Sequence, residues 1–391
     1  MGSAVPLIVF IQGAFRVVKV LVVDDSSFVR RSLTALLESD PTIQVVGQGK
    51  NGEEAIAMVK EFDPDVVTLD VEMPRMNGLK ALEQIMKEHP VPVIMVSALT
   101  SEGADTTLKA MELGALDFMP KLSANNMPKL SQSSMPDTAA MQKELTTKVK
   151  ALARRKAFLK LVHSRKHPKE PIGAAARLAA IVPQGATAKY TMPVIPAGSS
   201  PKFDAVAIGV STGGPPAVQK ILAAFPANFP VPILIAQHMP AAFTGPFAKR
   251  LDNQCAITVK EAEAVDRLRP GTAYICPGGK HIRLENRKGT LVGVITEEPK
   301  EALYKPSANV LMETAGIALG RRALCVMLTG MGNDGLEGTK ILKAKGGYAL
   351  AQSEATCVVY GMPKAIVDAK LADEVIDLDD MAAAIVSHIV K

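Results

Sequence analysis

Short apolar runs of strand length alternate with amphipathic stretches of helix length in two separate parts of the chain, residues 17–122 and 203–391. In the first part, the runs 17–23, 66–69 and 93–96 are almost entirely hydrophobic, which is typical of parallel strands buried on both faces. Strands that alternate with helices predict a parallel sheet with helices on both sides. We therefore expect an α/β protein with two doubly wound parallel-sheet domains, for which 391 residues suffice.

The stretch between these parts, residues 123–202, interrupts the alternation and predicts a linker rich in proline. Near its middle, one helical face would carry four apolar side chains, which indicates a helix that docks on a domain or a partner. These are Met141, Leu145, Val149 and Leu152. Residues 1–16 are interpreted as an appended N-terminal extension, with an export signal as the alternative.

The net charge of +6 is concentrated in one segment and makes neither domain basic. Residues 143–170 hold ten Lys or Arg against two acids, a local +8 that leaves −2 for the rest of the chain. We expect no nucleic-acid partner, although DNA binding through this segment stays open as an alternative. No apolar run reaches the length of a membrane span, so no membrane insertion is expected. The four cysteines lack metal-ligand spacing and favour reduced thiols in the cytoplasm.

Polar side chains follow the predicted strands of the first domain where each strand ends. Asp24 and Asp25 follow the first strand, and Asp70, Ser97 and Lys121 follow three later ones. Because the carboxyl ends of parallel strands meet at one sheet edge, these residues should lie together. Three adjacent carboxylates repel each other unless a divalent cation binds them, and oxygen ligands favour magnesium. A carboxylate beside that cation can accept a phosphoryl group, although singly each residue is an ordinary helix cap or surface charge.

The arrangement resembles the receiver domain of bacterial two-component response regulators. The likeness is carried by the segments VLVVDDSSFVRR, TLDVEMPRMNG, IMVSALT and DFMPK, and it covers residues 17–122. It implies a flavodoxin-like domain in which Asp70 is phosphorylated. It also implies that Asp24, Asp25 and Asp70 hold Mg²⁺.

The same resemblance assigns roles to residues around the phosphorylated aspartate. Ser97 and Lys121 would contact the phosphoryl group, and Phe118 would repack on activation. One departure is Leu122, where receivers usually have a proline.

A serine in the second domain lies in a short glycine turn between a predicted strand and a predicted helix. The segment GVSTGG places Ser211 after the apolar run 205–208, and the prolines that follow fix the start of the helix. GVSTG matches the G-x-S-x-G pattern of a serine nucleophile, although such short motifs are often plain turns or anion sites. A dinucleotide site needs an acidic residue at the end of the next strand, where the sequence has His238 instead.

Two further side chains could activate this serine. A histidine can act as the general base for a hydroxyl, and a carboxylate can orient the histidine. His238 follows a predicted strand, and Asp334 lies in a glycine-rich loop after another strand. His281, in CPGGKH, is the alternative base. Because geometry rather than chain order defines a triad, we expect Ser211, His238 and Asp334 to meet at the edge of one sheet.

The combination of both domains resembles the chemotaxis response-regulator family of protein-glutamate methylesterases. The signatures are IGVSTGGPPAV, AQHMPAAFT, CPGGKH and MLTGMGNDG. The resemblance implies that residues 203–391 form a Rossmann-like catalytic domain without a cofactor. This domain would hydrolyse γ-glutamyl methyl esters of chemoreceptors and deamidate receptor glutamines, with Ser211 as nucleophile, His238 as base and Asp334 as its orienting acid.

Regulation and partners are also implied by this resemblance. A chemotaxis histidine kinase would phosphorylate Asp70, and methyl-accepting chemotaxis receptors would be the substrates. The main-chain N–H groups of Thr212 and Met331 would stabilise the oxyanion. We expect the unphosphorylated receiver to cover the Ser211 cleft and phosphorylation to shift the population toward an open form.

Overall fold

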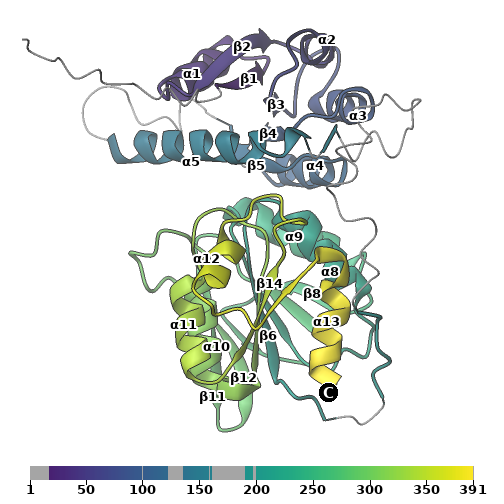
Figure 1. Cartoon of the computed structure of the whole chain (residues 1–391), viewed down its shortest axis with the longest axis vertical. Coiled ribbons are helices and arrows are strands. Elements are labelled where there is room, and N and C mark those ends of the chain that lie inside the picture. The colour runs from purple at the N-terminus through teal and green to yellow at the C-terminus, as the bar shows by residue number, and fades with distance from the viewer. Residues whose placement is uncertain are drawn as a thin grey trace, which may run out of the picture.

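The computed structural model describes residues 17–98, 100–121, 135–157, 159–160, 190–196 and 200–390. The predicted extension 1–16, Leu122 and much of the predicted linker lie outside these residues. Two α/β domains stack on one another, the N-terminal one purple to teal and the C-terminal one teal through green to yellow (Figure 1). The fold class predicted from the sequence is therefore confirmed.

The first domain is a five-stranded parallel sheet in the order β2-β1-β3-β4-β5. The strands are β1 (Val18–Val23), β2 (Ile43–Gly49), β3 (Val66–Asp70), β4 (Val93–Ser97) and β5 (Asp117–Pro120). The helices between them are α1 (Ser27–Glu38), α2 (Gly52–Phe62), α3 (Gly78–Glu88) and α4 (Ser101–Glu112). Each begins after a short polar residue whose side chain accepts a main-chain N–H of the first turn, which satisfies a donor that the helix leaves unpaired. These caps are Ser26, Asn51, Asn77 and Thr100.

The helix predicted within the linker is the fifth helix of the first domain. This helix, α5 (Met135–Ala153), packs on α1 and β1, where Leu145, Val149 and Leu152 are completely buried. The first domain therefore extends past the boundary predicted at residue 122. The helix belongs to this domain because burying its apolar face on the sheet stabilises both the helix and the sheet.

Several lysines of the basic segment are paired with carboxylates of the same domain. The pairs are Lys148 with Asp117, Lys150 with Asp40, Lys156 with Asp63 and Asp65, and Lys160 with Asp63. Recognition of a nucleic-acid backbone needs basic side chains that are directed at phosphates. The pairing of these lysines within the domain disfavours the alternative of DNA binding.

The second domain has a seven-stranded parallel sheet in the order β15-β14-β13-β6-β7-β10-β8. Its strands are β6 (Ala205–Val210), β7 (Ile233–Gln237), β8 (Thr258–Glu261), β10 (Thr272–Ile275), β13 (Ala323–Met327), β14 (Tyr348–Gln352) and β15 (Glu374–Ile376). A smaller antiparallel sheet consists of β9 (Val265–Arg267), β11 (His281–Arg287) and β12 (Thr290–Thr296). The strand order reverses between β6 and β13, and such a switch point leaves a crevice at the carboxyl ends of the strands.

Helices cover both faces of this sheet. They are α8 (Gly214–Ala224), α9 (Ala241–Asp252), α10 (Ala308–Leu319), α11 (Leu336–Ala344), α12 (Met362–Asp368) and α13 (Leu378–Val390). Buried residues of α8, α9 and α13 pack on one face, and those of α10, α11 and α12 pack on the other. Within the described ranges, no helix has the length and apolar character needed to cross a bilayer.

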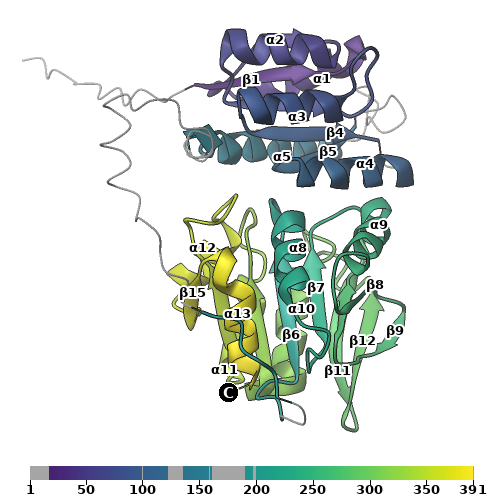
Figure 2. The same cartoon turned by 90° about the vertical axis from the view of Figure 1, so that its right-hand side faces the viewer.

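The first domain sits over the carboxyl edge of the second sheet. Figure 2 shows α4, β5 and α5 on the side that faces α8, α9 and α12. Helix α4 contacts both α8 and α9, and one hydrophobic cluster continues from the first domain into the second. The switch point between β6 and β13 therefore faces the first domain.

Candidate active site and acidic cluster

Ser211 lies in a tight turn between β6 and α8, at the carboxyl edge of the seven-stranded sheet. Its main-chain N–H donates to the Thr329 carbonyl at 3.0 Å, and its own carbonyl accepts the Gln237 amide at 3.0 Å. Gly213 has a φ of 75°, and a Cβ there would lie 2.5 Å from the side chain of Val358. Only glycine fits this position without strain. The turn therefore holds the serine in a fixed place at the sheet edge.

His238 lies between Ser211 and Asp334. Its Nδ1 is 3.1 Å from the Ser211 Oγ, and its Nε2 is 2.8 Å from the Asp334 Oδ2. An ionised carboxylate only accepts hydrogen bonds, so Nε2 carries the proton and Nδ1 is the acceptor for the serine hydroxyl. The three residues predicted from separate segments thus form one hydrogen-bonded chain, which is the geometry that general-base activation of a serine requires.

The Asp334 carboxylate lies buried at the N-terminus of α10. Besides His238, its oxygens accept the Ser307 hydroxyl at 2.9 Å and the main-chain N–H groups of Ala308 at 2.6 Å and Asn309 at 3.1 Å. Burial by itself raises the pKa of Asp334, but the hydrogen bond and charge of His238 and the two N–H groups lower it below its usual value. The carboxylate is therefore held ionised, which suits it to orienting the imidazole.

The alternative base, His281, has a different partner. It is completely buried in β11, and its Nδ1 accepts the main-chain N–H of Ser307 at 3.1 Å. Burial lowers the pKa of His281 and favours the neutral ring. Because Ser307 in turn donates to Asp334, His281 supports the residue before α10 whose hydroxyl binds the orienting carboxylate. His238, and not His281, is the histidine in contact with Ser211.

The sequence reasoning missed Tyr304, which lies in the loop between β12 and α10. Its ring stacks on the His238 imidazole with centroids 4.3 Å apart and planes inclined by 11°. No spacing or motif marks this residue, because the stack joins two segments that are far apart in the chain. Only the packing of the loop against the end of β7 brings the rings together.

The two predicted oxyanion residues flank the serine. Thr212 directly follows it, and Met331 follows Gly330, where a Cβ would lie 2.9 Å from the Ser211 Cβ. The side chain of Thr212 is engaged by the first domain, since its Oγ1 donates to the Asp117 Oδ2 at 2.7 Å. The turn that carries the candidate nucleophile is thus in direct contact with β5.

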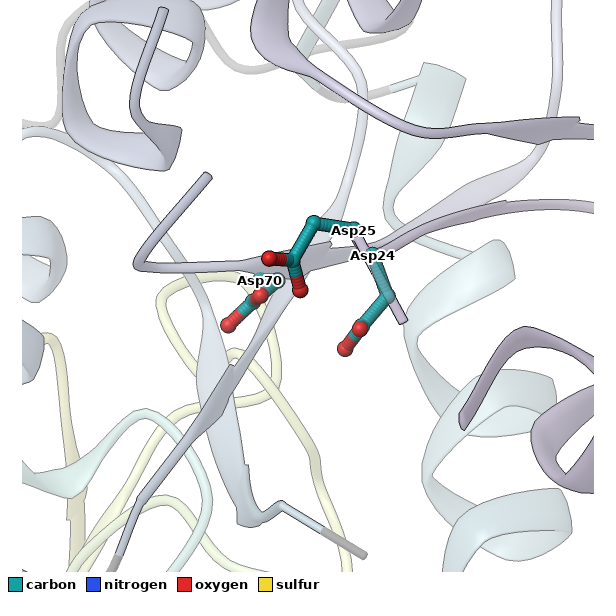
Figure 3. A group of neighbouring side chains, drawn as sticks. All are labelled: Asp24, Asp25 and Asp70. Atoms are coloured by element: carbon teal, nitrogen blue, oxygen red, sulfur yellow. The ribbon is translucent and has the colours of Figure 1, made fainter. Parts of the chain in front are cut away.

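A second candidate site lies in the first domain, where Asp24, Asp25 and Asp70 come together at the carboxyl edge of the sheet (Figure 3). One oxygen of each carboxylate lies within 4.8 Å of the others. The Lys121 Nζ is 2.5 Å from the Asp70 Oδ2, 3.3 Å from the Asp24 Oδ1 and 3.4 Å from the Asp25 Oδ1. These four predicted residues therefore do meet in the folded chain.

The acidic cluster holds three carboxylates against the single ammonium of Lys121. Burial is the main cause that raises the pKa of Asp70 to about 6; the hydrogen bond from Lys121 opposes it, and the charge of Asp24 adds to it. Burial also raises the pKa of Asp24, and its Oδ2 is buried without a hydrogen-bond partner among the described residues. Clustered carboxylate oxygens with one unpaired atom fit a divalent cation such as Mg²⁺, which prefers oxygen ligands.

Ser97 and Phe118 lie farther along the same sheet and are directed elsewhere. The Ser97 Oγ donates to the Gly103 carbonyl at 3.2 Å, in the first turn of α4. The Phe118 ring stacks on Phe243 of the second domain, with centroids 4.7 Å apart. Ser97 thus contacts α4, and Phe118 contacts the other domain.

Polar contacts between the domains surround this ring pair. Glu112, at the end of α4, accepts hydrogen bonds from three side chains of the second domain, which are Gln219, Arg250 and Gln254. Asp117 binds both Thr212 and Lys148 of α5. The β5 strand of the first domain is therefore joined to the turn that holds Ser211.

Family models match both domains. A model described as CheB methylesterase matches residues 206–385, and one described as response regulator receiver domain matches residues 20–130. A protein from Oleidesulfovibrio alaskensis called protein-glutamate methylesterase/protein-glutamine glutaminase 1 is 58% identical, with 96% of this chain and 100% of that protein covered.

Further relatives carry similar names. A protein-glutamate methylesterase/protein-glutamine glutaminase 2 from Nitratidesulfovibrio vulgaris is 57% identical over 96% of this chain and 100% of its own length. Among solved structures, the CheB methylesterase catalytic domain of Thermotoga maritima is 36% identical, covers 47% of this chain and 98% of its own, and has a TM-score of 0.46.

Proposed function

The chain belongs to the protein-glutamate methylesterase/protein-glutamine glutaminase family, and from this premise we propose that Ser211, His238 and Asp334 are its catalytic residues. The protein is a methylesterase/glutaminase of chemotaxis with a receiver domain. The observation that carries the proposal is the hydrogen-bonded chain from the Ser211 Oγ through the His238 ring to the Asp334 carboxylate, with distances of 3.1 and 2.8 Å.

The substrate is a γ-glutamyl methyl ester on a chemoreceptor. The Ser211 Oγ attacks the ester carbonyl while its proton passes to the His238 Nδ1, and the resulting imidazolium is stabilised by the ionised Asp334. The main-chain N–H groups of Thr212 and Met331 stabilise the oxyanion of the tetrahedral intermediate. The imidazolium returns the proton to the leaving methoxide, so methanol departs and an acyl ester remains on the serine.

Water completes the reaction. His238 takes a proton from a water molecule that attacks the acyl carbonyl, and it then returns this proton to the Ser211 Oγ, which releases the glutamate. A receptor glutamine follows the same course with ammonia as the leaving group. Both activities therefore use side chains and main-chain N–H groups of the second domain alone, and the acyl transfer requires no cofactor.

Regulation of this enzyme begins at Asp70, which we assign as the acceptor of a phosphoryl group from a chemotaxis histidine kinase. Asp24, Asp25 and Asp70 would hold Mg²⁺, which when bound offsets the negative charge of the three carboxylates and of the incoming phosphoryl oxygens. Lys121 lies beside all three carboxylates and would pair with the phosphoryl oxygens. Ser97 would contact the same oxygens after turning its hydroxyl away from α4.

Coupling between the two sites runs through β5. Phe118 stacks on Phe243, and Asp117 holds the Thr212 hydroxyl beside the nucleophile. These contacts support an unphosphorylated state in which the receiver covers the cleft. Phosphorylation would then favour the open state, and moving the population from about 1:99 to 99:1 takes about 5.5 kcal/mol of preference.

The test is methanol release from methylated receptor fragments, measured with and without a small-molecule phosphodonor and Mg²⁺. We expect slow release from the full chain alone, faster release with both additions, and no release by Ser211→Ala. Asp70→Asn should remain slow under all conditions. Methanol release by Ser211→Ala at the wild-type rate would contradict the catalytic assignment, and activation of Asp70→Asn would contradict the regulatory one.

A further inference from the structure

Tyr304 covers one face of the imidazole that the proposed mechanism uses as its base. The two rings are nearly parallel, with an interplanar angle of 11° and a centroid separation of 4.3 Å. Tyr304 also borders a cavity that Ser307 and Asp334 line, so it lies close to the orienting carboxylate as well as to the imidazole. The stack therefore acts on the same side chain that joins Ser211 to Asp334.

We propose that Tyr304 is a positioning residue for His238. This inference rests on the proposed function, because it assigns Tyr304 a part in the same acyl transfer. Two hydrogen bonds fix the direction of the imidazole within its plane, but an imidazole held only at its edges can still tilt about the axis that joins them. A flat aromatic surface against its face restricts that tilt and keeps Nδ1 directed at the Ser211 Oγ.

The stack also favours the charged form of the base. The face of an aromatic ring carries partial negative charge and attracts a cation that lies over it. His238 becomes an imidazolium only when it has taken the serine or water proton, so this attraction is greater in the transition state than in the resting enzyme. Interactions of that kind raise turnover rather than substrate affinity.

The ring of Tyr304, rather than its hydroxyl, carries this role. Among the hydrogen bonds between described residues, none involves the Tyr304 hydroxyl. Burial, the largest cause, and the charge of Asp334 raise the pKa of the Tyr304 phenol, so the ring remains neutral. Phenylalanine should therefore replace tyrosine, whereas an aliphatic side chain of similar size should not.

The experiment compares Tyr304→Phe, Tyr304→Leu and Tyr304→Met in the full chain, activated with a phosphodonor and Mg²⁺. Steady-state methanol release gives kcat and KM, and the rate of labelling by a fluorophosphonate reports the reactivity of Ser211 without receptor. We expect Tyr304→Phe to stay within about twofold of the wild type. In the Leu and Met variants, kcat and the labelling rate should fall about tenfold while KM stays nearly constant.

Controls separate this role from a folding defect and from failure of the proposed function. Leu303→Ala changes the neighbouring residue, which is 85% exposed, and should leave all three parameters unchanged. Thermal unfolding of each variant shows whether the domain is intact. A normal kcat in folded Tyr304→Leu and Tyr304→Met would overturn the inference. So would a loss of kcat in Tyr304→Phe as large as in these two variants, or a change in their KM without a change in kcat. Labelling that persists in Ser211→Ala would instead overturn the proposed nucleophile.

Discussion

Replacing Glu112 by alanine should raise the basal esterase activity of the unphosphorylated protein. Glu112 lies on α4 of the receiver, and its carboxylate accepts the Arg250 Nε at 2.8 Å together with a second bond from the same guanidinium. The Gln254 amide adds a bond at 3.1 Å. The hydrogen bond from Arg250 is the main cause that lowers the pKa of Glu112, so the carboxylate is ionised at neutral pH. The substitution removes this ion pair between the domains and leaves the catalytic residues untouched.

The size of the effect follows from the geometry and exposure of the pair. The Arg250 and Glu112 side chains are 26% and 30% exposed, so solvent screens their attraction. Exposed ion pairs stabilise a folded or bound state by about 0.2–1 kcal/mol. The two hydrogen bonds from Arg250 and the bond from the Gln254 amide raise the contribution of this contact to the closed state to about 1.4 kcal/mol. That amount changes an equilibrium about tenfold. If about 1% of unphosphorylated molecules are open, the variant should have about 9% open and a correspondingly higher basal rate.

The assay is methanol release from methylated receptor fragments without a phosphodonor and then with saturating phosphodonor and Mg²⁺. Only the rate measured without phosphodonor should rise, because the fully activated protein is already open. Asp204→Asn is the matched control, since Asp204 forms a bidentate pair with Arg322 inside the second domain. Glu112→Gln, which keeps an uncharged acceptor, should give a smaller increase than Glu112→Ala.

Three results would refute the reasoning. An unchanged basal rate in Glu112→Ala would mean that this contact does not hold the receiver over the cleft. An equal increase of the basal and activated rates would mean that the substitution alters catalysis rather than the closed state. A rise in the Asp204→Asn control would show that loss of any surface pair loosens the protein.

Three further predictions concern catalysis, electrostatics and packing. Asp334→Asn should reduce kcat about 10⁴-fold, because the amide favours the wrong imidazole tautomer; a wild-type rate would remove Asp334 from the mechanism. Asp70→Asn should stabilise the magnesium-free protein at pH 8 by on the order of 2–3 kcal/mol but should not stabilise it below pH 4. The reason is that folding raises the pKa of Asp70 from 3.8 to about 6, so the stabilising, protonated form is lost as pH rises through 6. Chemical denaturation in the presence of a chelator at both pH values checks the sign. Leu145→Ala should lower the stability of the receiver by about 2–5 kcal/mol, because the side chain is completely buried, and an unchanged melting temperature would show that α5 does not contribute to this core.

The residues that follow the carboxyl end of each strand could be predicted from the sequence. Buried parallel strands are almost entirely apolar, so Asp24, Asp70 and Ser211 stand out as the polar residues that follow such runs. A parallel sheet brings the carboxyl ends of its strands together whatever the length of the chain between them. The prediction that these side chains meet therefore needed only the order of apolar and polar residues.

The amphipathic face of α5 was equally visible, but its location was not. Leu145, Val149 and Leu152 predict a buried helical face, and a face of that kind fits any apolar surface of suitable shape. Their packing on β1 of the receiver places the helix in the first domain and pairs Lys148 with Asp117. The composition of residues 123–202, which predicts a linker, could not show whether the helix docks on a domain or on a partner.

The sequence by itself determined the two α/β domains, the acidic cluster and the candidates Ser211, His238 and Asp334, with His281 as the alternative base, because strand hydrophobicity and glycine turns are local properties. The tertiary structure alone decided that Nδ1 of His238 faces the serine, that Tyr304 covers the ring, and that Asp117 reaches Thr212 across the domain boundary. These contacts depend on side-chain packing between segments distant in the chain. Their free energies come from surfaces that exist only after folding, so no local pattern encodes them.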